Sequence, residues 1–409
     1  MVLIITKLII RDYMNFIFIS PAFPKSYYNF CNRLKKNGLN VLGIGDTPYN
    51  ELEQNVKDSL TEYYKVNSLE NYDEVYRGVA FFAFKYGKID FLESNNEYWL
   101  RQDAKLRTDF NITGAKVSDV ETFTSKSNMK EFYKKAGVPV ARYKFCSTYE
   151  EDIEFIKEVD FPVIVKPDVG VGAAATYKIK NEQDLKDFHN RGFQVPYIME
   201  EYIEGNIISC DGICDSNSNI VFSVNEIFPP SIMDIVNENL EVSYYVNMKT
   251  PDDVFDVGQR VIKAFNIKAR YFHLEFFRLT KAKKGIGEIG DIVALEVNMR
   301  PPGGFTPDLI NFGQSVDSYQ IYADVIAHDK VVNVDLNLDK YYCCYVGKRN
   351  RLSYKYNDQQ IRDKYATSIM MHDIMPEVLS GAMGNEFYVA RFIDFDEMNK
   401  FINMIFEKN

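Results

Sequence analysis

The chain has 409 residues, 46% of them hydrophobic and 26% charged, which is the composition of an ordinary globular protein. This length supports two or three subdomains around a substantial core. A formal net charge of -10 argues against nucleic acid as the main partner, because phosphate backbones bind to basic surfaces.

The beginning of the chain raises the question of a targeting segment. Residues 1–10 are apolar apart from Thr6 and Lys7, but they are too few to span a membrane and no small-residue cleavage site follows. Met14 leads directly into a strand-like run, so we expect residues 1–13 to be an added or mis-assigned leader. The six cysteines form no CxxC pair, which argues against a zinc site or a disulfide framework. We therefore expect a cytoplasmic protein without a membrane partner.

Strand and helix patterns alternate between residues 15 and 114. Such alternation predicts a parallel sheet with helices on its faces. A nicotinamide-binding fold is disfavoured, because Gly43 and Gly45 lack the third glycine of the phosphate-binding turn. We expect strands at residues 16–20, 40–44 and 89–93, and helices at residues 27–36 and 73–86.

A capped helix is expected from Ser125, which can accept a backbone hydrogen bond at the start, to Gly137, which can end it. Lys126 and Lys130 are four residues apart and therefore share one face of this helix. Two solvated lysines on a surface helix are the alternative interpretation.

The next motif is an apolar strand, residues 161–165, that ends at Lys166 and continues into a loop of small residues, 170–176. A lysine at the end of a buried strand needs an anion, because burying its ammonium group alone is costly. Backbone N–H groups of a glycine-containing loop can approach phosphates closely. The spacing is not that of a P-loop.

A strand at residues 197–201 ends in Glu200 and Glu201 and enters a turn at Gly205, with Asp211 a few residues further on. Free backbone groups after such a strand can bind an adenine edge. A strand exit with solvated acids is the alternative.

Residues 272–277 and 295–300 have the β-branched and aromatic content of strands, and residues 281–291 between them read as a hairpin connection. Side chains two apart on a strand share a face, so Glu296, Asn298 and Arg300 point one way. If the hairpin matches that face with His273 and Glu275, oxygen ligands suited to Mg²⁺ converge beside a guanidinium. A solvent-facing edge hairpin is the alternative.

The remaining segments carry less chemical information. We expect a long loop over the site at residues 225–250, a helix at 252–265 and another at 315–327. Residues 340–409 are expected to form strands followed by a helix through residues 396–406, with a core strand at 388–392. Tyrosines between 341 and 356 could line a pocket or belong to the core.

These motifs, in this order between residues 15 and 330, resemble the ATP-grasp superfamily, in particular its carboxylate–amine ligases. The resemblance implies a mixed α/β fold with a doubly wound parallel N-terminal subdomain, a small lid subdomain and a larger antiparallel sheet. The corresponding ranges are 14–114, 115–200, 201–330 and a C-terminal extension, 331–409, that packs on the catalytic subdomain.

The resemblance also implies roles for individual residues. Mg²⁺ or Mn²⁺ would be bound by Glu275, Glu296 and Asn298, and Arg300 with Lys166 would be catalytic. The nucleotide ATP would be contacted by Lys126, Lys166, Gly170, Gly172, Ala173, Glu200, Glu201, Tyr202, Ile203 and Asp211. The chain has Asn206 where many members carry an acid for the ribose, so no ribose-binding residue is assigned.

The resemblance implies an ADP-forming ligase that joins a small carboxylate to an amine through an acyl-phosphate; a homodimer is left open. One alternative is an enzyme that uses bicarbonate, like biotin carboxylase or carbamoyl-phosphate synthase. The other is a nucleotide-binding module without catalysis, which should have lost a metal ligand or Arg300.

Overall fold

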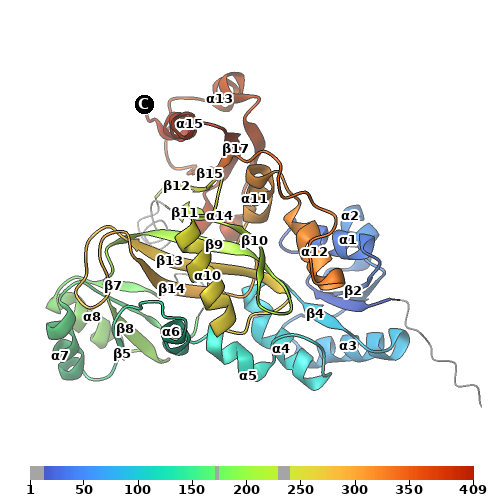
Figure 1. Ribbon diagram of the computed structural model, residues 1–409, viewed down its shortest axis with the longest axis horizontal. Coiled ribbons are helices and arrows are strands. Elements are labelled where there is room, and N and C mark those ends of the chain that lie inside the picture. Colours follow the sequence, from blue (N-terminus) through green and yellow to red (C-terminus); the bar gives the residue numbers. More distant parts are fainter. Residues whose placement is uncertain (1–12, 171–174, 229–239) are drawn as a thin grey trace, which may run out of the picture.

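A computed structural model of the chain describes residues 13–170, 175–228 and 240–409. Figure 1 shows three sheets: one near the N-terminus, a small one formed by residues 143–201, and a large one that reaches the C-terminal region. The mixed α/β class with separate parallel and antiparallel sheets confirms the expected fold class.

The N-terminal sheet is parallel, with strand order β3-β2-β1-β4. Every residue of β1 is buried, because helices cover both faces of the sheet. The expected strands and helices between residues 16 and 93 are confirmed, whereas α2 and β3 were not foreseen. The elements are β1 (Asn15–Ile19), α1 (Tyr28–Lys36), β2 (Asn40–Gly45), η1 (Tyr49–Glu51), α2 (Gln54–Ser59), β3 (Glu62–Lys65), α3 (Tyr72–Tyr86), β4 (Phe91–Glu93), η2 (Glu97–Trp99) and α4 (Leu100–Asp109).

The small sheet is antiparallel, with strand order β5-β8-β6-β7. It is preceded by α6, whose N-cap Ser125 accepts a hydrogen bond from the Asn128 amide, as the sequence predicted. Its elements and those leading to it are α5 (Val117–Val120), η3 (Glu121–Phe123), α6 (Lys126–Lys135), β5 (Tyr143–Phe145), α7 (Tyr149–Val159), β6 (Val163–Pro167), β7 (Tyr177–Ile179), α8 (Glu182–Arg191) and β8 (Tyr197–Glu201).

The large sheet follows the order β14-β13-β9-β11-β12-β15-β17-β16, and β10 pairs with β9. Helix α10 covers one face through a cluster that includes Val257, Leu274 and Val297. Its elements up to residue 328 are β9 (Gly205–Cys214), β10 (Ile220–Val224), β11 (Glu226–Phe228), β12 (Val242–Val246), α10 (Asp252–Ala264), β13 (Arg270–Leu279), β14 (Ile292–Asn298), α11 (Thr306–Gln314) and α12 (Ser318–His328).

The expectation of one long loop at residues 225–250 is wrong. Strands β11 and β12 lie in this stretch and pair with each other in the large sheet. Both are short, three and five residues, so alternation along the sequence is too brief to reveal them. Residues 229–239 of that expected loop lie outside the described residues.

The C-terminal strands continue the large sheet, because β15 pairs with β12. Tyr345 of β15 is fully buried, so this tyrosine belongs to the core. In the described part of the chain, no helix has the length and apolar character needed to cross a membrane. The last elements are β15 (Tyr342–Lys348), α13 (Asp358–Tyr365), β16 (Ile369–Ile374), α14 (Glu377–Met383), β17 (Glu386–Phe392) and α15 (Phe395–Phe406).

Candidate active site

Two carboxylates face each other across the hairpin of β13 and β14. The strands pair antiparallel with Glu275 opposite Glu296 and His273 opposite Asn298. These four side chains share one face of the sheet, whereas Leu274 joins the apolar cluster on the α10 face. The hairpin and its matched faces are therefore as the sequence predicted.

The two carboxyl groups have different electrostatic surroundings. Burial and the charge of Glu275 raise the pKa of Glu296, although Lys126, 3.6 Å from its Oε1, acts to lower it. Burial also acts to raise the pKa of Glu275, but the hydrogen bond and charge of His273 outweigh it. His273 Nε2 lies 3.4 Å from Glu275 Oε1. Burial is thus the main cause of the raised pKa of Glu296, whereas His273 offsets burial at Glu275.

Asp211 contacts two neighbouring side chains of the large sheet. Asp211 is fully buried, and its carboxylate is hydrogen-bonded to His273 Nδ1 and to the Ser209 hydroxyl. Burial would lower the pKa of His273, but Asp211 and Glu275 raise it well above the ordinary value. Asp211 is therefore the buried partner of the His273 imidazolium, and its expected contact with a nucleotide stays a prediction.

Glu200 occupies the space between two lysines. Its carboxylate oxygens lie 2.8 Å from Lys130 Nζ and 2.9 Å from Lys166 Nζ, and all three side chains are buried. Burial would raise the pKa of Glu200, but the two ammonium groups lower it to about 2. The Glu200 side chain thus belongs to an ion-pair triad with Lys166 and Lys130, and Lys130 was not assigned to the site from the sequence.

Lys126 is positioned by the segment that follows β6. The Asp168 carboxylate accepts hydrogen bonds from the Ser125 hydroxyl and the Ser127 amide, both at 2.8 Å. Asp168 thereby ties this segment to the start of α6, and Lys126 Nζ donates to the Gly170 carbonyl at 3.2 Å. The other two loop residues of the expected nucleotide contact, Gly172 and Ala173, lie outside the described residues.

The connection between β8 and β9 contains the other expected adenine contacts. The Glu201 carboxylate is buried and pairs with Arg142 at 2.7 Å and with Lys283 at 3.4 Å. Ile203 packs in a small apolar cluster. Tyr202 and Ile203 lie between the two strands, so their backbone groups are outside both sheet ladders. The Tyr202 ring centroid lies 3.9 Å from Lys178 Nζ, and the expected contacts with a base stay a prediction.

Arg300 follows β14 and contacts the N-terminal subdomain. Its Nη2 and Nε donate to Glu97 Oε2 at 2.7 and 3.1 Å. Burial would lower the pKa of Arg300, whereas Glu97 raises it. Glu97 was not identified from the sequence, because nothing in its neighbourhood marks a partner 203 residues away.

The donor set fits a hard divalent cation. Glu275, Glu296 and Asn298 offer oxygen ligands of the kind that Mg²⁺ prefers, and Glu296 is a buried carboxylate opposite a second one, Glu275. Lys126, Lys166 and Arg300 provide cations for phosphate and carboxylate oxygens nearby. The arrangement is suited to positioning and neutralising phosphoryl groups.

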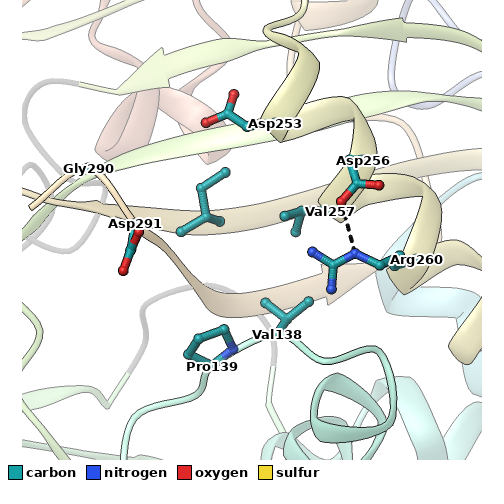
Figure 2. Close-up of a pocket in the computed structure, with 9 residues that line it drawn as sticks. Val138, Pro139, Asp253, Asp256, Val257, Arg260, Gly290 and Asp291 are labelled. Atoms are coloured by element: carbon teal, nitrogen blue, oxygen red, sulfur yellow. Dashed lines mark hydrogen bonds and ion pairs between the residues drawn. The ribbon is translucent and has the colours of Figure 1, made fainter. Parts of the chain in front are cut away.

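One pocket described near this sheet is not part of the site. It has a volume of about 310 Å³ and lies between α10, residues 138–139 and residues 290–292 (Figure 2). Its lining residues Val257 and Ile292 belong to the apolar cluster on the face opposite Glu275 and Glu296. Its charged groups are paired in part, with Arg260 Nε 3.0 Å from Asp256.

A second group of possible metal ligands lies near the C-terminus. Among the described residues, Asp358, His372 and Glu386 place ligand atoms within 4.8 Å of one another. Lys348 is 3.1 Å from Glu386, and Arg362 is 2.8 Å from Asp358. Because these cations already neutralise the carboxylates, we regard the group as an ion-pair network.

Comparison with known proteins gives the same assignment as the geometry. Residues 123–304 match the family model of the ATP-grasp domain. The L-arginine-specific L-amino acid ligase of Bacillus subtilis is 26% identical over 216 residues, which cover 50% of this chain and 52% of that protein. This ligase and three carbamoyl phosphate synthase large chains that are 22% to 28% identical are matched over only 12% to 52% of their own length.

Solved structures resemble the whole chain. The L-amino acid ligase from Bacillus licheniformis has a TM-score of 0.70 at 12% identity, with 96% of this chain and 97% of that chain covered. The biotin carboxylase domain of 2-oxoglutarate carboxylase from Hydrogenobacter thermophilus, in complex with MgADP and bicarbonate, has a TM-score of 0.66 at 16% identity, covering 95% and 89%. Residues 123–304 therefore resemble an ATP-grasp domain, and the chain shares its fold with these enzymes over nearly its whole length.

Proposed function

We propose that the protein is an ATP-dependent ligase that joins a carboxylate to an amine through an acyl-phosphate and releases ADP and phosphate. One observation carries this proposal: paired carboxylates, lysines and an arginine fork converge on one face of the β13–β14 hairpin. The ATP-grasp match and the likeness to an L-amino acid ligase support it.

The proposed reaction has two steps. A carboxylate oxygen of the substrate attacks the γ-phosphorus of ATP, and the bond from this phosphorus to ADP breaks. The amine nitrogen then attacks the acyl carbon, the carbon–oxygen bond to phosphate breaks, and nitrogen loses a proton. The first step needs positioning and charge neutralisation more than covalent chemistry from the protein.

The residues divide these tasks. Lys126 and Lys166 neutralise phosphate oxygens, and Arg300 holds the carboxylate and then the oxyanion of the tetrahedral intermediate, since its planar fork binds two oxygens. Glu275, Glu296 and Asn298 would hold one or two Mg²⁺ (or Mn²⁺) ions, which supply further neutralisation of phosphate charge. His273 keeps Glu275 ionised and oriented.

The proposal is tested by phosphate release with Mg·ATP across paired pools of amino acids, small carboxylates and amines, with mass spectrometry of the products. We expect phosphate release to require both a carboxylate and an amine. Reactions that contain only one of the pools are the controls. Release with bicarbonate alone would favour a carboxylase-like reaction instead. Tight ATP binding without release in any pool would favour a non-catalytic nucleotide-binding module.

A further inference from the structure

The guanidinium that the proposed reaction needs is already bound to a carboxylate of the protein. Two nitrogens of Arg300 donate to the single oxygen Oε2 of Glu97, at 2.7 and 3.1 Å. The remaining terminal nitrogen donates to the Pro301 carbonyl at 2.9 Å. Glu97 therefore occupies the side of Arg300 at which a substrate carboxylate would form charge-assisted hydrogen bonds.

Glu97 comes from a part of the fold that faces ligands in related architectures. It begins η2, directly after β4 of the parallel N-terminal sheet. Ligands of open parallel sheets bind in the crevice outside the carboxyl ends of the strands. Arg300 follows β14 of the large sheet, so the pair spans the space between two subdomains. This is where a substrate would lie between the N-terminal sheet and the metal ligands.

The Arg300–Glu97 pair is more open to exchange than the ion pair beside it. The side chains of Arg300 and Glu97 are each 21% exposed. Those of Arg270 and Glu93, which join the same two sheets, are only 5% and 9% exposed. Glu93 also holds the buried Arg107 at 2.9 Å. The junction between subdomains therefore keeps this more buried pair when Glu97 leaves Arg300.

We propose that Glu97 is a specificity-determining residue that holds the Arg300 guanidinium in the empty site and is displaced by the carboxylate of the substrate. This inference rests on the proposed function. A neutral group cannot take the place of Glu97, because it would leave the largely buried guanidinium without a counter-charge. A carboxylate can, because one anion replaces another. The interaction with Glu97 is lost on binding, so it subtracts from the affinity for the substrate.

The chain contains its own reporter for this exchange. Trp99 is the single tryptophan and lies in η2, two residues after Glu97. Its ring packs edge-on against the Tyr98 ring, with 4.7 Å between centroids. Displacement of Glu97 should change this packing. We therefore expect acetate, used as a probe carboxylate with Mg·ADP present, to change Trp99 fluorescence in the wild-type protein.

The decisive comparison is between wild type, Glu97→Gln and the control Glu121→Gln. Glu121 also begins a short 3-10 helix, but its side chain is exposed. Calorimetric titration should show that Glu97→Gln binds acetate about tenfold more tightly, because a neutral amide competes less for the guanidinium. Glu121→Gln should match the wild type. For a carboxylate substrate found by turnover, KM should fall about tenfold in Glu97→Gln, with kcat nearly unchanged.

Unchanged, weaker or absent acetate binding in Glu97→Gln, in a variant whose thermal unfolding matches the wild type, would overturn the role of Glu97. So would acetate binding to the wild type without a change in Trp99 fluorescence. Acetate binding needs no turnover, which separates the two proposals. A wild-type protein that exchanges Glu97 for acetate but ligates no substrates would refute the proposed ligase reaction and leave the exchange standing.

Discussion

The side chain of Glu200 shows how one carboxylate compensates buried positive charges in this protein. One carboxylate serves two buried ammonium groups, Lys130 and Lys166, at 2.8 and 2.9 Å. Removing one member of a buried ion pair is costly, because the other charge stays out of water without compensation. For the same reason, Lys126 lies beside Glu296, and His273 lies beside Asp211.

Replacing Glu200 by Gln should therefore lower the free energy of unfolding by about 3 kcal/mol, measured by urea denaturation. The matched control is Glu131→Gln, which removes an exposed pair with Lys134 and should cost less than about 1 kcal/mol. Equal stability of the two variants would contradict the triad.

The triad also predicts a pH dependence. Because the pKa of Glu200 is about 2 in the folded protein, against an ordinary value of 4.5, its contribution to stability is present above pH 4.5. This contribution is lost as the pH falls from 4.5 toward 2. The difference in stability between wild type and Glu200→Gln should shrink over that interval. A difference that stays constant with pH would show that the low pKa is wrong.

Glu296→Ala should abolish ATP turnover, with a loss of phosphate release of about a hundredfold or more, while circular dichroism stays unchanged. The reason is that Glu296 is one of the three proposed metal ligands and lies opposite Glu275 in the hairpin. Glu288→Ala, in the exposed connection of the same hairpin, is the control. Unchanged phosphate release from a folded Glu296→Ala protein would remove the assignment of a metal ligand.

Several site residues could be predicted at this scale and others could not. Glu275, Glu296 and Asn298 follow from alternation along two strands that are close in sequence. Glu97 could not be predicted, because its contact with Arg300 joins subdomains 203 residues apart. Lys130 was visible as a partner of Lys126 on one helix face, but only the fold brings Glu200 to it.

At the scale of elements, the long strands and capped helices could be predicted because each carries many periods of its pattern. Helix α6 begins after its Ser125 cap, and β13 spans ten residues. Strand β11 has three residues and is stabilised by pairing with β9 and β12, so its identity is set by neighbours distant in sequence. The expectation of a loop at residues 225–250 is wrong for this reason.

Strand β9 provides a test at this scale. A Cβ atom at Gly212 would lie 2.1 Å from the Phe222 carbonyl oxygen and 2.9 Å from the Phe272 ring. Gly212→Ala should therefore force β9 and β10 apart and lower the free energy of unfolding by about 2 kcal/mol. Gly381→Ala, in α14 with nothing within 4 Å, should instead be neutral or stabilising by up to about 1 kcal/mol. Equal unfolding curves for the two variants would contradict the close pairing of β9 and β10.

At the scale of the whole molecule, the order of motifs predicted the fold class better than any single motif did. What the sequence could not supply is the junction between sheets, where Glu93 binds Arg107 and Arg270. It also did not show that the C-terminal strands extend the large sheet through β12 and β15. Both depend on pairing between segments that are far apart in the chain.

The central claim is that a substrate carboxylate is activated by phosphoryl transfer at the β13–β14 hairpin. The most direct measurement uses a substrate carboxylate labelled with ¹⁸O, with Mg·ATP and the amine that supports turnover. An acyl-phosphate passes one carboxylate oxygen to phosphorus, so the account predicts ¹⁸O in the released inorganic phosphate, together with ADP. Unlabelled phosphate, or label in AMP, would contradict it.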